Sequence, residues 1–215
     1  ISASHWVAWQ VTDIFENIGV VQEGMMTIAR PIALSDSPRA GTLTVTRGHI
    51  RFEDIRFGYG RESGLIDGLT LDVMPGEKIG LVGRSGAGKS TLVNLLLRFF
   101  DLEGGRILID GQDIATVSQE SLRTQISMVT QDTSLLHRSI RDNIRYGRSN
   151  ASDADIIAAS RMAHAHEFIV ELEDWKGRRG YGAHVGERGV KLSGGQRQRV
   201  AIARVILKDA PILVL

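Results

Sequence analysis

The 215-residue sequence contains no cysteine, which excludes disulfide bonds and thiolate metal sites. Its formal net charge is only +1, so the composition argues against a dedicated nucleic-acid surface. No apolar run approaches the roughly eighteen residues that indicate a membrane-spanning helix. The six histidines have no spacing that demands a metal, and we expect them on the surface. A hydrophobic content of 42% allows a sizeable core, and the length suits either one large domain or one domain plus appendages.

A complete G-x-x-x-x-G-K-[ST] phosphate loop is the most informative stretch. It consists of Gly83, Arg84, Ser85, Gly86, Ala87, Gly88, Lys89 and Ser90. The short apolar run at 78–82 predicts a buried strand before it, and the periodic run at 91–97 predicts a helix after it. This context favours a nucleotide site over a glycine-rich turn that merely precedes a helix.

Each residue type in this loop suits phosphate binding. Glycines allow the backbone to wrap so that N–H groups point at phosphate oxygens, and the helix adds the positive end of its dipole. Lys89 supplies a mobile charge for the β- and γ-phosphates, and the Ser90 hydroxyl is placed to bind Mg²⁺. The motif therefore predicts a site for a nucleotide with Mg²⁺.

The segment before this domain has a different character. Apolar residues at three- and four-residue steps over 1–30 predict an amphipathic helix, interrupted at Gly19 and Gly24 and stopped at Pro31. Either it is an ordinary surface helix, or it continues a preceding segment. The composition of 31–47 predicts a linker, which places the main domain boundary near Gly48.

Strand patterns flank the phosphate loop on both sides. Residues 49–57 and 65–73 predict strands, Pro75 and Gly76 predict a turn, and 106–109 followed by Asp110 and Gly111 predicts a hairpin. These segments indicate an antiparallel sheet beside a parallel core. Tyr59, presented from a glycine-flanked turn, is either a packing residue or a platform that stacks on a purine.

The next part of the chain, about 114–190, is predicted to be mainly helical. Capping signatures begin at Thr116 and Ser152, and the second opens a helical tract that extends to about Trp175. A short strand at 126–130 ends at Gln131, whose amide could reach a metal or a water at the γ-phosphate. Taken alone, Gln131 is more typical of a surface loop.

A second motif follows at 192–196, namely Leu192, Ser193, Gly194, Gly195 and Gln196. Ser193 and Gln196 form a capping box that opens a helix with an apolar face. Glycines are nevertheless poor helix formers in a first turn. Their presence is explained if an anion must approach the exposed amides of this helix end.

Phosphate loop and L-S-G-G-Q sequence together resemble the ATP-binding cassette (ABC) family over about residues 48–215. The resemblance implies an α/β fold: a P-loop NTPase (RecA-like) core with an antiparallel β flank and an inserted α-helical subdomain. It implies that ATP and Mg²⁺ bind here, with Tyr59 stacking on adenine and Ser90 and Gln131 at the metal. Lys89 and Gln131 are the implied catalytic residues. The phosphate cradle is implied to be 83–90 with Thr91. The resemblance also implies that an ATP held by a partner domain is capped by Ser193, Gly194, Gly195 and Gln196.

The same resemblance implies partners and a location. Two such domains, identical or different, would sandwich two ATP molecules. Residues 186–189 are similar to an exporter loop that meets the transmembrane domain, and 1–30 to the extension of a last transmembrane helix. We therefore expect an exporter with membrane and ATPase domains in one chain, whose ATPase domain lies at the cytoplasmic face of the inner membrane, without a nucleic-acid partner.

The end of the sequence departs from the family pattern. Residues 211–215 resemble the Walker B strand, but the acidic residues that should follow it are not in the sequence. We expect this to be a fragment of a longer polypeptide, with little nucleotide binding or hydrolysis by itself. Two alternatives remain: a non-catalytic regulatory module that binds ATP, and a soluble ABC ATPase of the DNA-repair class.

Overall fold

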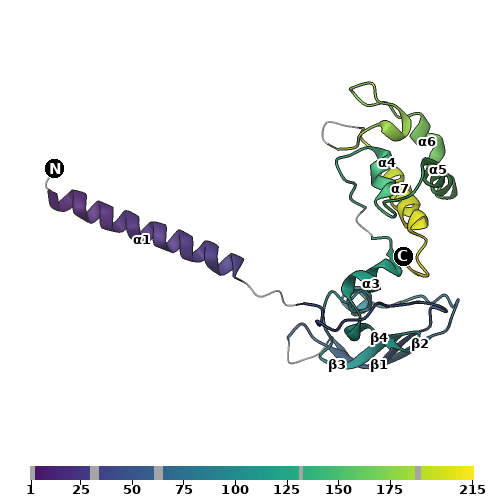
Figure 1. Ribbon diagram of the computed structural model, residues 1–215, viewed down its shortest axis with the longest axis horizontal. Coiled ribbons are helices and arrows are strands. Elements are labelled where there is room, and N and C mark those ends of the chain that lie inside the picture. The colour runs from purple at the N-terminus through teal and green to yellow at the C-terminus, as the bar shows by residue number, and fades with distance from the viewer. Residues whose placement is uncertain (1–2, 30–33, 61–64, 131–132, 187–189) are drawn as a thin grey trace. The chain divides into compact units, whose positions relative to one another are not determined.

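The computed structural model describes residues 3–29, 34–60, 65–130, 133–186 and 190–215. These residues form two compact units, Ile1–Ser35 and Asp36–Leu215, drawn with their elements in Figure 1. The second unit contains the phosphate loop and the second motif. It accounts for all the strands among the described residues.

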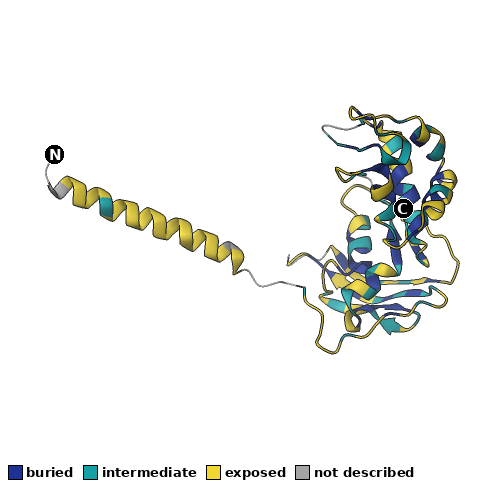
Figure 2. Cartoon of the chain, turned by 45° about the horizontal axis from the view of Figure 1, so that its top comes forward, coloured by how far each residue is buried: buried dark blue, intermediate teal, exposed yellow. Residues whose placement is uncertain are grey.

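The first unit is one long helix, α1 (Ala3–Ile28). The predicted interruptions at Gly19 and Gly24 are wrong, because the helix runs through both positions. Each glycine costs only about 1 kcal/mol relative to alanine in a helix, which a helix of 26 residues tolerates. Figure 2 shows that α1 is exposed along almost its whole length. In the part of the chain that the structure describes, no helix is both long and apolar enough to cross a membrane.

An antiparallel sheet of four strands begins the second unit, in the order β2-β1-β3-β4. The strands are β1 (Ile50–Phe57), β2 (Ile66–Val73), β3 (Gly104–Ile109) and β4 (Gln112–Asp113). The predicted hairpin is confirmed: Ile109 pairs with Gln112 across a two-residue turn. Asp110 and Gly111 both have positive φ, 48° and 78°, as a type I′ turn requires.

Two short parallel strands, β5 (Ile126–Met128) and β6 (Ile212–Val214), form a second sheet. The buried strand predicted at 78–82 is not formed. This segment is assigned to no strand, and Val82 is 98% exposed. An apolar run becomes a strand only where a neighbouring strand accepts its hydrogen bonds, and the two sheets formed by the described residues do not include it.

Helices complete the unit around two separate cores. The helices are α2 (Lys89–Leu96), α3 (Gln119–Thr124), α4 (Ile140–Arg145), α5 (Asp153–Met162), α6 (His166–Val170) and α7 (Gly194–Lys208), with short 3₁₀ turns η1 (Ile114–Thr116) and η2 (Gly180–Gly182). The first core joins α2, α3 and η1 to both sheets. The second joins α4, α5, α6 and α7, which Figure 1 shows gathered together.

These cores shift the predicted limits of the helical part. Ile114 and Leu122 are buried in the first core, although the sequence suggested a helical subdomain from about 114. Val200 and Leu207 of α7 are buried in the second core, beyond the predicted limit of 190. The predicted cap at Thr116 is also replaced: Ser118 caps α3 by accepting a hydrogen bond from Ser121 N. The capping box at Ser152 is confirmed.

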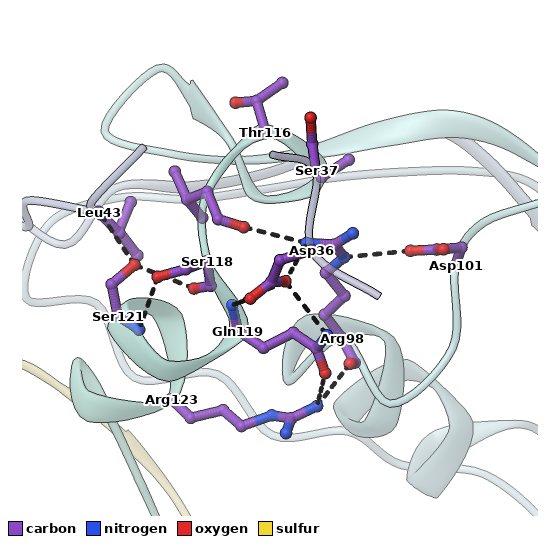
Figure 3. A network of polar contacts seen from close by, with 12 residues as sticks. Asp36, Ser37, Leu43, Arg98, Asp101, Thr116, Ser118, Gln119, Ser121 and Arg123 are labelled. Carbon is purple, nitrogen blue, oxygen red and sulfur yellow. Dashed lines mark hydrogen bonds and ion pairs between the residues drawn. The ribbon is translucent and has the colours of Figure 1, made fainter. Parts of the chain in front are cut away.

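The second unit begins at Asp36, well before the predicted boundary near Gly48. The Asp36 carboxylate accepts hydrogen bonds from the backbone N–H and the side-chain amide of Gln119, and it pairs with Arg98 at 3.3 Å (Figure 3). Leu43 is fully buried in the first core. Because these contacts join sequence-distant residues, the local composition of 31–47 did not disclose them.

Candidate nucleotide site

The phosphate loop leads directly into α2 through glycines in the left-handed region. Gly86 has φ 82° and Gly88 has φ 85°, a conformation that costs residues with a Cβ about 1–2 kcal/mol. Between them the Ala87 N–H donates to the carbonyl oxygen of Arg84 at 3.1 Å. A Cβ at Gly83 would lie 3.2 Å from the Ala87 side chain. The loop therefore has the tight backbone for which its glycines were predicted.

Lys89 is the first residue of α2 and bends back over the loop. Its ammonium group donates to the carbonyl oxygens of Gly83, at 2.8 Å, and Arg84, at 2.9 Å. Both partners belong to the loop, so the charge is held over the segment predicted to wrap around phosphates. These carbonyl oxygens carry no formal charge, so neither contact is an ion pair.

The N-terminus of α2 differs from those of most other helices in the unit. A serine side chain caps each of α3, α4, α5 and α7. By contrast, Gly88 occupies the cap position of α2 and makes no side-chain hydrogen bond. The first intrahelical bond runs from Leu92 N to Gly88 O, so the preceding amides of the first turn lie ahead of the helical ladder. An uncapped helix end with a lysine beside it favours an anion.

Ser90 and Thr91, both in the first turn of α2, differ in their exposure to solvent. The Ser90 side chain is exposed, whereas Thr91 is buried. The Thr91 hydroxyl lies 3.3 Å from the hydroxyl of Tyr59. The structure thus brings the predicted aromatic residue to the start of the phosphate-loop helix, although the two are far apart in the sequence.

Tyr59 lies in the turn after β1 and is held between two other rings. Its φ is 56°, and Gly60 continues the turn with φ 72°. Phe57 and Phe100 lie nearly perpendicular to it, at centroid distances of 4.6 and 5.0 Å. Even so, 47% of Tyr59 is exposed. This is the arrangement of a supported aromatic ring with free surface for a ligand.

The second motif begins α7 as predicted. Gln196 N donates to the Ser193 hydroxyl, and Ser193 N donates to the Gln196 side chain, which completes the capping box. Around Gly195 there is open space where a Cβ would lie, and the nearest atom to such a Cβ at Gly194 is 4.0 Å away. The helix end is therefore capped from one side and accessible at its two glycines.

A buried carboxylate organises the loop that precedes the second motif. Asp174 accepts hydrogen bonds from the backbone N–H groups of Lys176, Arg178 and His184, and it pairs with the Arg178 guanidinium at 2.7 Å. Burial opposes ionisation of Asp174, but these donors hold its pKa well below the usual range. Asp174 is thus a charged anchor inside this loop.

Some predicted site residues lie outside the described part of the chain. Gln131 is one, and 187–189 of the predicted exporter loop are others. Of the two residues predicted to bind Mg²⁺, the described residues contain Ser90 alone, whose exposed hydroxyl suits a hard cation that also binds phosphate oxygens and water. The residues present are therefore compatible with Mg²⁺ brought in by a nucleotide.

Sequence reasoning missed the groups that support Tyr59. Phe100 follows α2 in an apolar stretch with no recognisable motif, and Glu103, whose carboxylate accepts a hydrogen bond from Gly60 N next to Tyr59, is one of many acidic residues. Their importance depends on a contact between the turn at Tyr59 and the loop after α2. The pairing of β1 with β3 places these two segments together, and it joins residues far apart in the sequence.

Comparison with known proteins identifies relatives of the chain. Residues 66–215 match the ABC transporter family. An ABC transporter ATP-binding protein of Haemophilus influenzae is 59% identical over 99% of this chain and 34% of its own length. The beta-(1→2)glucan export ATP-binding/permease protein NdvA of Rhizobium johnstonii is 50% identical over 85% of this chain and 32% of its own length.

A solved structure shows the same fold. It is that of a bacterial Atm1-family ABC exporter with ATP bound, which is 46% identical and has a TM-score of 0.82. The match covers 93% of this chain and 34% of the exporter chain. The chain thus spans about one third of the length of the relatives it matches.

Proposed function

Because the chain belongs to the ABC transporter family, we propose that it is the ATP-binding and ATP-hydrolysing motor domain of an exporter. The observation that carries this proposal is the uncapped N-terminus of α2, where a glycine loop and the Lys89 ammonium meet beside the exposed ring of Tyr59. A triphosphate suits the glycine loop and the Lys89 ammonium at this helix end, and an aromatic base suits the exposed ring of Tyr59.

The described residues divide the binding of ATP between them. The loop 83–88 and the first amides of α2 surround the phosphates, and Lys89 exchanges its carbonyl partners for β- and γ-phosphate oxygens. Thr91 supports the cradle from its buried position, and Tyr59 stacks on the adenine ring. Ser90 would hold Mg²⁺ together with the nucleotide, and the bound ion would neutralise charge on the phosphates.

Hydrolysis requires an oriented water and a second domain. Gln131 is proposed to contribute to the first requirement as a ligand near the γ-phosphate. Ser193, Gly194, Gly195 and Gln196 are proposed to cap an ATP bound by the partner domain. Gly194 and Gly195 support this role because their open surroundings allow a phosphate to approach the start of α7.

The partners follow from this arrangement. A second nucleotide-binding domain, identical or different, would close on this one when ATP binds and separate after hydrolysis. We assign α1 to the cytoplasmic extension of a transmembrane helix in the same polypeptide, so the motor would lie at the cytoplasmic face of the inner membrane. The resulting cycle would drive transport of a substrate across that membrane.

ATP hydrolysis by the whole protein in a lipid bilayer tests the proposal. Lys89→Ala should lower the hydrolysis rate by about 100-fold or more, because it removes a charge aimed at the transferred phosphate. Lys78→Ala, which removes an exposed lysine outside the loop, is the matched control and should leave the rate unchanged. ATP binding without any turnover would instead support a regulatory module, and equal rates for both variants would contradict the site.

A further inference from the structure

The ring of Tyr59 is fixed by a part of the chain that no motif marks. We propose that Phe100 is a positioning residue: together with Glu103, it fixes the orientation of the Tyr59 ring. That orientation in turn determines how strongly the site binds a nucleotide base. This inference rests on the proposed function, because it assumes that Tyr59 stacks on the base.

Direct ring contacts give the first support. Phe100 lies 5.0 Å from Tyr59 with an angle of 82° between the ring planes, and 5.5 Å from Phe57. Phe57 in turn lies 4.6 Å from Tyr59 at 72°. Edge-to-face pairs of this kind hold a preferred orientation beyond what apolar burial alone provides. Phe57 is buried in the core, so Phe100 is the exposed support of the ring.

Two hydrogen bonds of Glu103, one through its backbone and one through its side chain, join the same two segments. Glu103 N donates to Arg56 O at 3.0 Å, next to the end of β1. The Glu103 carboxylate accepts from Gly60 N at 3.2 Å, directly after Tyr59. The turn that carries Tyr59 is therefore bound on both sides to the loop that carries Phe100.

Hydrogen bonds and ion pairs join the loop that carries Phe100 to the C-terminus of the phosphate-loop helix α2. After α2, Arg98 adopts φ 47°, its N–H donates to Leu95 O, and Phe99 N donates to Asn94 O. These are the two hydrogen bonds of a Schellman motif, with arginine where glycine is usual. The Arg98 side chain is 7% exposed and pairs with Asp36 and Asp101, which holds that conformation.

The two ends of α2 thus connect the groups proposed to bind the two parts of the nucleotide, its phosphates and its base. The N-terminus of α2 presents the phosphate loop, and the chain that leaves its C-terminus presents Phe100 to Tyr59. The Tyr59 hydroxyl lies 3.3 Å from the Thr91 hydroxyl, so Tyr59 also contacts the first turn of this helix. Because the ring contacts of Phe100 are with Phe57 and Tyr59, its loss should weaken binding of the base more than binding of the phosphates.

Phe99 offers a matched control. It precedes Phe100 and is also exposed, but its ring lies against the Arg123 guanidinium at 4.8 Å. Phe99→Leu removes the same number of atoms from the same loop without touching the support of Tyr59. Phe100→Tyr keeps a ring at the supporting position and should rescue binding.

The experiment compares Mg-ATP with Mg-tripolyphosphate, which has the phosphates without the base, in equilibrium titrations of the whole protein. Phe100→Leu should lower ATP affinity about three- to tenfold and leave tripolyphosphate affinity within about twofold, because the lost ring pairs orient Tyr59, which is proposed to stack on the base. Phe99→Leu and Phe100→Tyr should match the wild type with both probes. Circular dichroism confirms that each variant is folded.

The outcomes separate this inference from the function on which it rests. If Phe100→Leu lowers the affinities for both probes equally, its role is structural and the inference is wrong. If it changes neither affinity, the inference is also wrong, while ATP binding by the wild type would still support the proposed function. Failure of the wild type to bind ATP would overturn the proposed function, and the inference with it.

Discussion

Asp36 holds the start of the second unit against the ends of two helices, and its replacement by alanine should be costly. The carboxylate accepts hydrogen bonds from both the backbone N–H and the side-chain amide of Gln119, at 3.1 Å each. It also pairs with Arg98 at 3.3 Å, as Figure 3 shows. Asp36→Ala removes all these contacts and leaves Arg98 inside the fold.

The remaining partners of Arg98 set the size of the effect. Arg98 keeps an ion pair with Asp101 at 3.1 Å and a hydrogen bond to Val117 O at 3.0 Å. The cost should therefore be smaller than the roughly 3–5 kcal/mol of a buried charge left without any partner. Hydrogen bonds to a charged group contribute about 1.5–3 kcal/mol, and the Asp36 side chain is only 34% exposed. We expect Asp36→Ala to lower the free energy of unfolding by about 2 kcal/mol.

Asp101→Ala is the comparison that makes this prediction specific. Asp101 pairs with the same guanidinium, but its side chain is 56% exposed, and exposed ion pairs contribute at most about 1 kcal/mol. Urea unfolding followed by far-ultraviolet circular dichroism should show a midpoint about 1 M lower for Asp36→Ala, and a shift of less than half that for Asp101→Ala. Equal midpoints for Asp36→Ala and the wild type would refute the reasoning.

Three further predictions concern stability. Gly105→Ala should destabilise by roughly 3 kcal/mol, because φ is 75° and a Cβ would lie 2.4 Å from two backbone oxygens of β1; an unchanged urea midpoint would contradict this. Ser152→Ala should cost about 1 kcal/mol in the same assay through loss of the α5 cap, and no shift would argue against the capping box. Burial opposes ionisation of Asp110, but four backbone N–H donors hold its pKa well below the usual value. The stabilisation from Asp110 is therefore present above about pH 4 and lost as the pH falls below it, so urea midpoints measured between about pH 6 and pH 2.5 should fall less steeply in Asp110→Asn than in the wild type.

The sequence predicted those elements whose signals are local. Alternation over 49–57 predicted β1, and the Asp110 and Gly111 pair predicted the hairpin between β3 and β4. The capping boxes at Ser152 and Ser193 predicted the starts of α5 and α7, and both boxes form. In each case a few neighbouring residues contain the backbone preference and the hydrogen-bond partner.

Features that depend on partners far away in the sequence were predicted wrongly or were missed. The apolar run at 78–82 predicted a strand, but a strand also needs a neighbour, which the run itself does not reveal. The composition of 31–47 predicts a domain boundary near Gly48, but it does not reveal the contact between Asp36 and Gln119, which are far apart in the chain. Phe100 was missed for the same reason.

The sequence predicted the elements that carry several residues of the candidate site, and the binding roles of these residues stay predictions. The loop glycines, Lys89 at the start of α2 and the cap at Ser193 lie in the elements expected of them. Tyr59 was singled out by its turn, and its contact with Thr91 now connects it to the phosphate loop. What the sequence did not reveal is the support behind Tyr59, because ring packing follows from the fold and has no motif.

Titration calorimetry of Mg-ATP into the whole protein, with its Lys89→Ala variant beside it, tests the central claim most directly. If the phosphates bind between the glycine loop and the start of α2, the wild type should bind ATP and Lys89→Ala should bind at least about tenfold more weakly, since a charged phosphate partner is lost. Equal affinities of the two proteins for Mg-ATP would contradict the claim that this loop is the nucleotide site.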